Sequence, residues 1–154
     1  MAQDFIPANP QFADRVYDSF ARQGVMGLIG ARMTRVEPGV VEIELPFRPD
    51  LTQQHGFFHA GITSTIADSA GGLAGFTLFP AEASVLTVEF KINLLAPADG
   101  ERLRAKGQVI RAGRTLAICQ LDVFAIKTGR EKHCATGLQT LAVISGRPDI
   151  ATPG

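Results

Sequence analysis

The stretch from Gln53 to Pro80 reads QQHGFFHAGITSTIADSAGGLAGFTLFP, and it decides the fold. It carries one acid, Asp68, and no other Asp, Glu, Lys or Arg occurs between Asp50 and Glu82. From about Ala60 onward, apolar residues recur at three- and four-residue spacing, which predicts a helix packed on a core. These residues are Ile62, Ile66, Ala70, Leu73 and Phe76.

The side of this helix that carries Asp68 is rich in small residues, namely Gly61, Ser64, Gly71, Gly72 and Gly75. Each glycine inside a helix costs about 0.5–1 kcal/mol relative to alanine, so we expect a second backbone or a ligand to approach closely there. A carboxylate in such surroundings suits a general base, a nucleophile or a group that orients water. The alternative is that Asp68 merely faces solvent.

The composition indicates one globular domain, because 154 residues suffice for a proper core. The 15 basic residues balance the 15 acidic ones, so nothing favours nucleic acid or an anionic membrane as a partner. The N-terminal residues MAQDFIPANPQF lack the cationic start of a secretory signal, and we expect a cytoplasmic protein. The apolar stretch 56–80 contains Asp68 and His59, so we interpret it as a buried helix and not as a membrane span.

Helix and strand patterns flank this central segment. Asn9 and Pro10 start an N-terminal helix that should end near Gly24. Residues 27–47 contain two strand-like runs around the turn 37–39, which predicts a hairpin. Strand patterns then cover residues 84–97, 101–112, 114–126 and 131–144, and a frayed tail is expected from Gly146. In the first of these strands Val88, Phe90, Ile92 and Leu94 alternate with Thr87, Glu89, Lys91 and Asn93. One long helix among antiparallel strands predicts an α+β domain.

The segment HAGITSTIAD resembles the HGG-x6-D signature of the hotdog-fold acyl-CoA thioesterases of the phenylacetate-pathway (PaaI-like) group. Gln53, Gly56 and the segments TVEFKINLLAPA and AGRTLA extend the resemblance over roughly residues 27–145. It implies a hotdog fold, an antiparallel sheet wrapped around a long central helix. The expected division is an N-terminal helical segment at 1–26, the hotdog domain at 27–146 and a flexible tail at 147–154.

The resemblance also implies roles for individual residues. Asp68 corresponds to the carboxylate that acts as base or nucleophile on the thioester. Ala60, where the family usually has glycine, and Gly61 correspond to the helix start, whose backbone N–H polarises the carbonyl. Gln53 would hydrogen-bond the carbonyl or the attacking water. Thr87 would help to orient that water, or it is an ordinary strand threonine.

Other residues allow more than one interpretation. His59 is expected to hydrogen-bond backbone at the helix start, and a catalytic contribution stays open. His55 lies four residues before it, but only His133 remains as a further histidine, so no metal site is expected. Phe57 and Phe58 either line an acyl pocket or hold the loop onto the core. Cys119 and Cys134 lack a CxxC spacing and should be free, buried thiols, and neither a GxSxG nor a GxGxxG motif occurs.

Coenzyme A would belong to the substrate, and no separate cofactor is expected. The basic residues Arg111, Arg114 and Lys106, grouped with the turn at Gly113, are candidates for its phosphates. Backbone groups of Gly113, Arg114, Thr115 and Gly137 are the alternative. Surface Arg and Lys at a hairpin are more often simply solvated.

The spacing of Ala60 and Asp68 predicts an oligomer. Eight residues of helix span ~12 Å, so one carbonyl cannot touch both ends. A two-fold homodimer with antiparallel long helices would bring Ala60 of one copy to Asp68 of the other. The resemblance implies such a dimer with a shared active site, and two dimers joined into a tetramer.

The sequence thus favours an acyl-CoA thioesterase for aryl or medium-chain acyl groups. A non-catalytic hotdog module that binds acyl-CoA is the main alternative. A hotdog hydratase ranks last, because Asp68 and His59 are too far apart on one chain to act as a pair.

Overall fold

The computed structural model describes residues 3–150 of the chain. The elements follow in the order α1 (Phe12–Ala21), α2 (Gly24–Ile29), β1 (Arg32–Glu37), β2 (Val40–Pro46), the 3-10 helix η1 (Pro49–Leu51), α3 (Ala60–Phe76), β3 (Ser84–Leu94), β4 (Arg102–Ala112), β5 (Leu116–Lys127) and β6 (Arg130–Ile144). Apart from α2 and η1, this is the predicted order.

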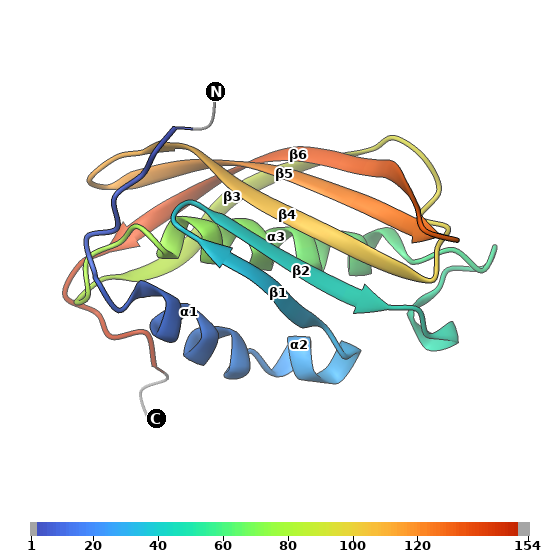
Figure 1. The fold of residues 1–154 in the computed structure, drawn as a ribbon, viewed down its shortest axis with the longest axis horizontal. Helices are drawn as coiled ribbons and strands as arrows, with labels where there is room; N and C mark the ends of the chain where they lie inside the picture. Colours follow the sequence, from blue (N-terminus) through green and yellow to red (C-terminus); the bar gives the residue numbers. More distant parts are fainter. Residues whose placement is uncertain (1–2, 151–154) are drawn as a thin grey trace.

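One antiparallel sheet with the strand order β1-β2-β4-β5-β6-β3 curves around α3, as Figure 1 shows. The predicted helix start at Ala60 is confirmed, and Ile66, Ala70 and Phe76 of the predicted stripe are fully covered. On the β1–β2 hairpin, Val41 and Ile43 turn toward the helix and are also buried. The α+β hotdog architecture is therefore confirmed.

The glycines of α3 serve the packing of this chain on itself. A Cβ atom at Gly71 would overlap Gln139, and one at Gly75 would overlap Leu141 of β6. Gly107 of β4 in turn lets the sheet touch the backbone of α3. At Gly71 and Gly75 the space expected to receive a second backbone or a ligand is filled by side chains of the chain's own sheet. At Gly72 no atom lies within 4 Å of a Cβ position.

The N-terminal region differs from the prediction. The first helix ends at Ala21, and residues 24–29, the last of which were predicted to start a strand, form a second short helix. Gly30 ends α2 with a φ of 80°, a left-handed conformation that glycine adopts without strain. Arg15 fastens α1 to the end of α3, since its guanidinium donates to the carbonyl of Pro80 at 2.7 Å and lies 3.9 Å from the Phe76 ring centre.

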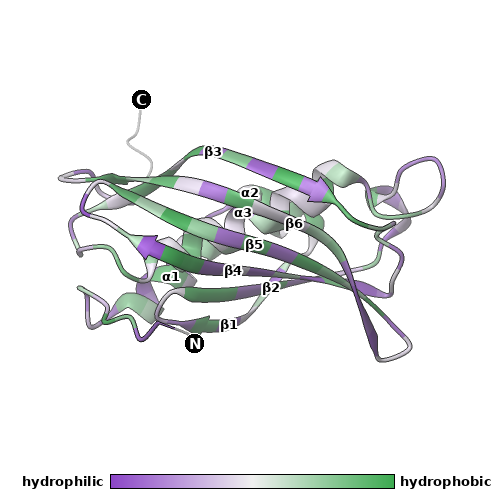
Figure 2. Cartoon of the chain, turned by 90° about the horizontal axis from the view of Figure 1, so that it is seen from above, coloured by the Kyte–Doolittle hydropathy of each residue, from purple (hydrophilic) through white to green (hydrophobic). Residues whose placement is uncertain are grey.

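Strand β3 lies at the free edge of the sheet and is not the half-buried strand that its alternation predicted. Leu86, Val88, Phe90 and Leu94 keep between 43% and 60% of their surface exposed, and Figure 2 shows green, apolar segments along this edge. A β-bulge also interrupts the alternation, because Thr87 pairs with Leu141 while Glu89 pairs with Thr140. The extra residue turns Thr87 to the face that α3 covers, and not outward with Glu89.

The chain beyond β6 returns along the molecule to α1. Asp149 is hydrogen-bonded there by Arg22 and by Ser84, and the predicted fraying from Gly146 stays a prediction. The rest of the predicted flexible tail, residues 151–154, lies outside the described residues, as do residues 1 and 2. Within residues 3–150, the helices are too short or too polar to cross a membrane.

Candidate active site

Asp68 lies in the middle of α3 and is held by two neutral donors from the sheet. Its Oδ1 accepts a hydrogen bond of 2.8 Å from Thr87 Oγ1 and one of 2.6 Å from Gln139 Nε2. Gln139 Nε2 also lies 3.1 Å from the Asp68 carbonyl oxygen and 3.2 Å from Thr87 Oγ1. Oδ2 of Asp68 receives no hydrogen bond from residues 3–150. One oxygen is therefore fixed and the other is free for a reactant.

Gln139 was missed by the sequence analysis. It is 1% exposed, which is rare for a glutamine, and Gly71 leaves the space for its side chain. The sequence feature that could have identified it is the alternation of the last predicted strand, which places the polar Gln139 on the same inward face as Ala135 and Leu141. An unexplained inward polar side chain near a candidate acid indicates a hydrogen-bond partner for that acid.

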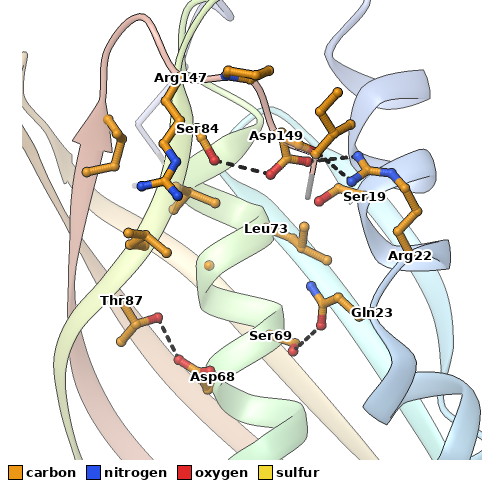
Figure 3. A pocket seen from close by; sticks show the side chains of 16 residues that line it. Ser19, Arg22, Gln23, Asp68, Ser69, Leu73, Ser84, Thr87, Arg147 and Asp149 are labelled. Atoms are coloured by element: carbon orange, nitrogen blue, oxygen red, sulfur yellow. Dashed lines mark hydrogen bonds and ion pairs between the residues drawn. The ribbon is translucent and has the colours of Figure 1, made fainter. Parts of the chain in front are cut away.

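A cavity of about 550 Å³ opens beside Asp68, between α3, α1, the start of β3 and the C-terminal segment (Figure 3). Asp68 and Thr87 lie at one end of it, and Ser84, Asp149 and Arg22 lie at the other. At the side of this cavity, Ser69 Oγ of α3 donates a hydrogen bond of 2.8 Å to Gln23 Oε1. Figure 3 shows this link together with the Thr87–Asp68 hydrogen bond. The volume is typical of a site for a small organic group.

The start of α3 is built differently. His59 is its N-cap, and its Nδ1 accepts the N–H of Gly61 at 2.8 Å, so the predicted backbone bond of His59 is confirmed. That bond occupies the N–H of Gly61. The N–H of Ala60 has no partner among the described residues. Ala60 is therefore the open donor at the positive end of the helix dipole.

A second cavity of about 490 Å³ lies at this end of α3 and is lined by Gln53, Phe57, Phe58 and Ala60, among others. Gln53 Oε1 accepts the N–H of His55 at 2.5 Å, which orients the amide and leaves its nitrogen as a donor. Phe58 is buried and packs edge-to-face on Phe47, with ring centres 5.5 Å apart. Phe58 therefore anchors the loop on the core and also lines this second cavity, while its predicted role in an acyl pocket stays a prediction.

The residues considered for coenzyme A are not assembled at either cavity. Arg111, Gly113, Arg114 and Thr115 are exposed around the β4–β5 turn, and neither cavity includes them. Lys106 is not near that turn, because it lies five residues earlier in β4, opposite Glu42 and Asp122. Gly137 pairs with Ile92 and Leu121 inside the sheet, where a Cβ would overlap the Lys91 carbonyl. Packing alone explains this glycine.

Both cysteines are free and buried, as predicted. Burial raises the pKa of Cys119 to about 12 and also raises the pKa of Cys134. A thiol that stays protonated at neutral pH is a poor nucleophile. Neither thiol therefore competes with Asp68 as a candidate nucleophile.

An antiparallel sheet wrapped around a long helix is the architecture of the hotdog fold, and here it carries a carboxylate at mid-helix and an open N–H at the helix start. The chain belongs to the thioesterase superfamily, whose family model matches residues 55–132. The matched part contains His59, Ala60, Asp68 and Thr87. It ends at Lys132, within the first residues of β6 and before Gln139.

Individual relatives agree with this assignment. A thioesterase family protein from Silicibacter pomeroyi is 50% identical, with a TM-score of 0.86 over 88% of this chain and 99% of its own. The 1,4-dihydroxy-2-naphthoyl-CoA hydrolase of Escherichia coli is 24% identical over 120 residues, which are 78% of this chain and 86% of that protein. The PaaI protein of the E. coli phenylacetic acid degradation operon has a TM-score of 0.78 at 15% identity, over 91% of this chain and 98% of that one, and shares the fold.

Proposed function

We propose that the protein hydrolyses acyl-CoA thioesters with aryl or medium-chain acyl groups, in active sites shared by two copies of the chain. The observation that carries this proposal is the split of the catalytic groups. Each chain carries two separate half-sites. The carboxylate half-site at mid-helix is Asp68 with its free oxygen, and the carbonyl half-site at the helix start consists of the free donors of Ala60 and Gln53. The ~12 Å of helix between Ala60 and Asp68 prevents one chain from using both on a single carbonyl.

The exposed edge of β3 supports a two-fold dimer. An apolar strand with free backbone groups at a sheet edge readily pairs with a second copy of itself. Antiparallel pairing of two β3 strands would set the two α3 helices side by side in opposite directions. The carboxylate half-site of one copy would then face the helix start of the other, and Phe90 and Leu94 would lose contact with water.

In this arrangement the thioester carbonyl oxygen accepts the N–H of Ala60 and the side-chain amide of Gln53. The helix dipole and both donors stabilise the negative charge that develops on this oxygen. In one route the free Oδ2 of Asp68 of the other copy takes a proton from water while the water oxygen attacks the carbonyl carbon, and this proton passes to the coenzyme A sulfur as the C–S bond breaks. In the other route Oδ2 attacks the carbonyl carbon itself and displaces the coenzyme A thiolate to form a mixed anhydride, and water then hydrolyses the anhydride and supplies the proton that the thiolate takes up. Thr87 and Gln139 hold the opposite carboxylate oxygen in place, and coenzyme A leaves as the thiol. Single-turnover hydrolysis in ¹⁸O-labelled water distinguishes the two routes.

Several finer points belong to the same proposal. Coenzyme A as carrier is supported by the relative that is named a CoA hydrolase. Arg111 and Arg114, which have no ion-pair partner within residues 3–150, are suited to its phosphates from the β4–β5 turn. The outward Leu116 and Leu138, about half exposed, favour the association of two dimers.

The test is steady-state hydrolysis of acyl-CoA thioesters from acetyl to palmitoyl, with phenylacetyl and benzoyl included, for wild type and Asp68→Asn. We expect turnover of at least one aryl or medium-chain thioester and a loss of about a hundredfold or more in kcat for Asp68→Asn, about 2.7 kcal/mol of barrier. Binding of acyl-CoA by both proteins without any hydrolysis would instead establish a binding module.

A further inference from the structure

We propose that the cavity beside Asp68 receives the acyl group and that the C-terminal segment, fastened by Asp149, sets the length of acyl group that fits. This inference rests on the proposed function. The C-terminal segment and the residues around the end of α1, which close the cavity, lie outside residues 55–132, the region shared with the thioesterase family model.

The far wall of the cavity is built by the two ends of the chain. From the C-terminal part come Ile144, Arg147, Pro148, Asp149 and Ile150, from α1 comes Ser19, and from the two residues between α1 and α2 come Arg22 and Gln23. The near end belongs to α3 and β3, which carry Asp68 and Thr87. From Asp68 to Leu73 the cavity follows α3 for about 7.5 Å. An acyl group that starts at Asp68 therefore meets the C-terminal segment after a short distance.

Asp149 ties three segments together at this wall. Its Oδ2 lies 3.0 Å from Nη2 of Arg22, the residue directly after α1, and its Oδ1 accepts a hydrogen bond of 3.2 Å from Ser84 Oγ at the start of β3. A second nitrogen of Arg22 donates to the Asp149 backbone carbonyl. Figure 3 shows Arg22 and Ser84 converging on Asp149 at the end of the cavity opposite Asp68.

The surroundings make this contact stronger than an ordinary surface ion pair. The Asp149 side chain is 21% exposed, whereas Asp18, which also pairs with Arg22, is 70% exposed. Exposed pairs contribute little, while partly buried pairs that are also hydrogen-bonded contribute more. A chain too long for the cavity has to displace Asp149 from both partners. Shorter acyl groups leave the wall intact and are preferred.

The experiment measures binding of two non-hydrolysable probes, octyl-coenzyme A and hexadecyl-coenzyme A thioethers, by isothermal titration calorimetry. Wild type should bind the octyl probe more tightly. Asp149→Ala should shift the ratio of the two Kd values by about tenfold or more toward the hexadecyl probe. Asp149→Asn keeps an acceptor for Ser84 and Arg22, so its ratio of Kd values should lie between those of wild type and Asp149→Ala. Asp18→Ala is the matched control, because it removes a partner of Arg22 outside the cavity, and it should leave the ratio unchanged.

An unchanged ratio in Asp149→Ala, or equal binding of both probes by wild type, would overturn the inference. Hydrolysis of octanoyl-CoA and palmitoyl-CoA by the same variants separates it from the proposed function. A shifted binding ratio without any hydrolysis supports the length-setting wall and refutes the thioesterase. Hydrolysis together with an unchanged binding ratio supports the thioesterase and refutes the length-setting wall.

Discussion

The two half-sites on α3 are made in different ways. At the helix start, the contacts join residues that are close in sequence. His59 caps the helix, and the backbone N–H of His55 orients the side-chain amide of Gln53. At mid-helix, Asp68 depends on Thr87 and Gln139, which lie 19 and 71 residues further along the chain. The half-site that binds the carbonyl is thus local, and the half-site that carries the acid is tertiary.

This difference indicates how each half-site can fail. The local half-site should survive distant changes in the sheet, while the acid should respond to substitutions on β3 and β6. Both should fail together when the two copies separate, because neither half-site alone contains the donors and the carboxylate.

Separating the copies should have the largest effect. Phe90→Lys places a charge on the apolar edge of β3, where a second strand cannot cover it. We expect a monomer in light scattering and a loss of about a thousandfold or more in kcat/KM, since both positioning and oxyanion stabilisation are lost. Leu28→Lys on α2, where leucine is 74% exposed, is the matched control. A fully active Phe90→Lys monomer would refute the shared site.

The local half-site is tested by Gln53→Ala. Removing one donor to the developing oxyanion should lower kcat by about a hundredfold, because such donors act mainly in the transition state. The neighbouring Gln54, which is exposed and lines neither cavity, provides the control as Gln54→Ala. Equal activity of the two variants would remove Gln53 from the mechanism.

The tertiary half-site is tested by Gln139→Leu. The substitution keeps the volume but leaves Asp68 without its shortest hydrogen bond, so kcat should fall about ten- to a hundredfold with little change in KM. Thr87→Val should cost less, about threefold to tenfold, because Thr87 is exposed and water can replace its hydroxyl. An unchanged kcat in Gln139→Leu would show that Gln139 contributes only to packing and does not position Asp68.

The smallest effects concern two adjacent glycines. Gly71→Ala forces a methyl group into Gln139 and Leu121, and should lower the free energy of unfolding by about 1–3 kcal/mol. Gly72→Ala meets no atom within 4 Å and should raise it by up to about 1 kcal/mol through helix propensity. Urea titrations of both variants measure the difference, and similar destabilisation by both would contradict the packing described for α3.

Much of the fold followed from the sequence because its signals are local. The stripe of α3, the hairpin turn at 37–39 and the strand alternation after Pro80 each depend on neighbours within a few residues. Asp68 and His59 could be singled out from their place in and before the predicted helix, whereas Ala60 and Gln53 were singled out through the resemblance to the thioesterases. The orientation of Thr87 could not, since alternation groups it with Glu89 and only the bulge at Val88 reverses it.

The remaining errors share a physical cause. Gln139 reaches Asp68 only through the pairing of β6 beside β3. Gly71 and Gly75 were expected to face a second backbone or a ligand, because the sequence alone does not show that side chains of their own sheet fill this space. Asp149 is held by Arg22, 127 residues earlier in the chain. Contacts over such separations depend on register, which a single sequence specifies weakly.

The most direct test of the shared site is a complementation experiment. Asp68→Asn and Gln53→Ala chains are co-expressed with different tags, and the mixed dimer is purified through both. If each site takes Asp68 from one copy and Gln53 from the other, one of the two sites is intact, and kcat should recover to about half of the wild-type value. If both groups act within one chain, each site of the mixed dimer stays defective and the activity remains at the level of the parent variants, which would contradict the account.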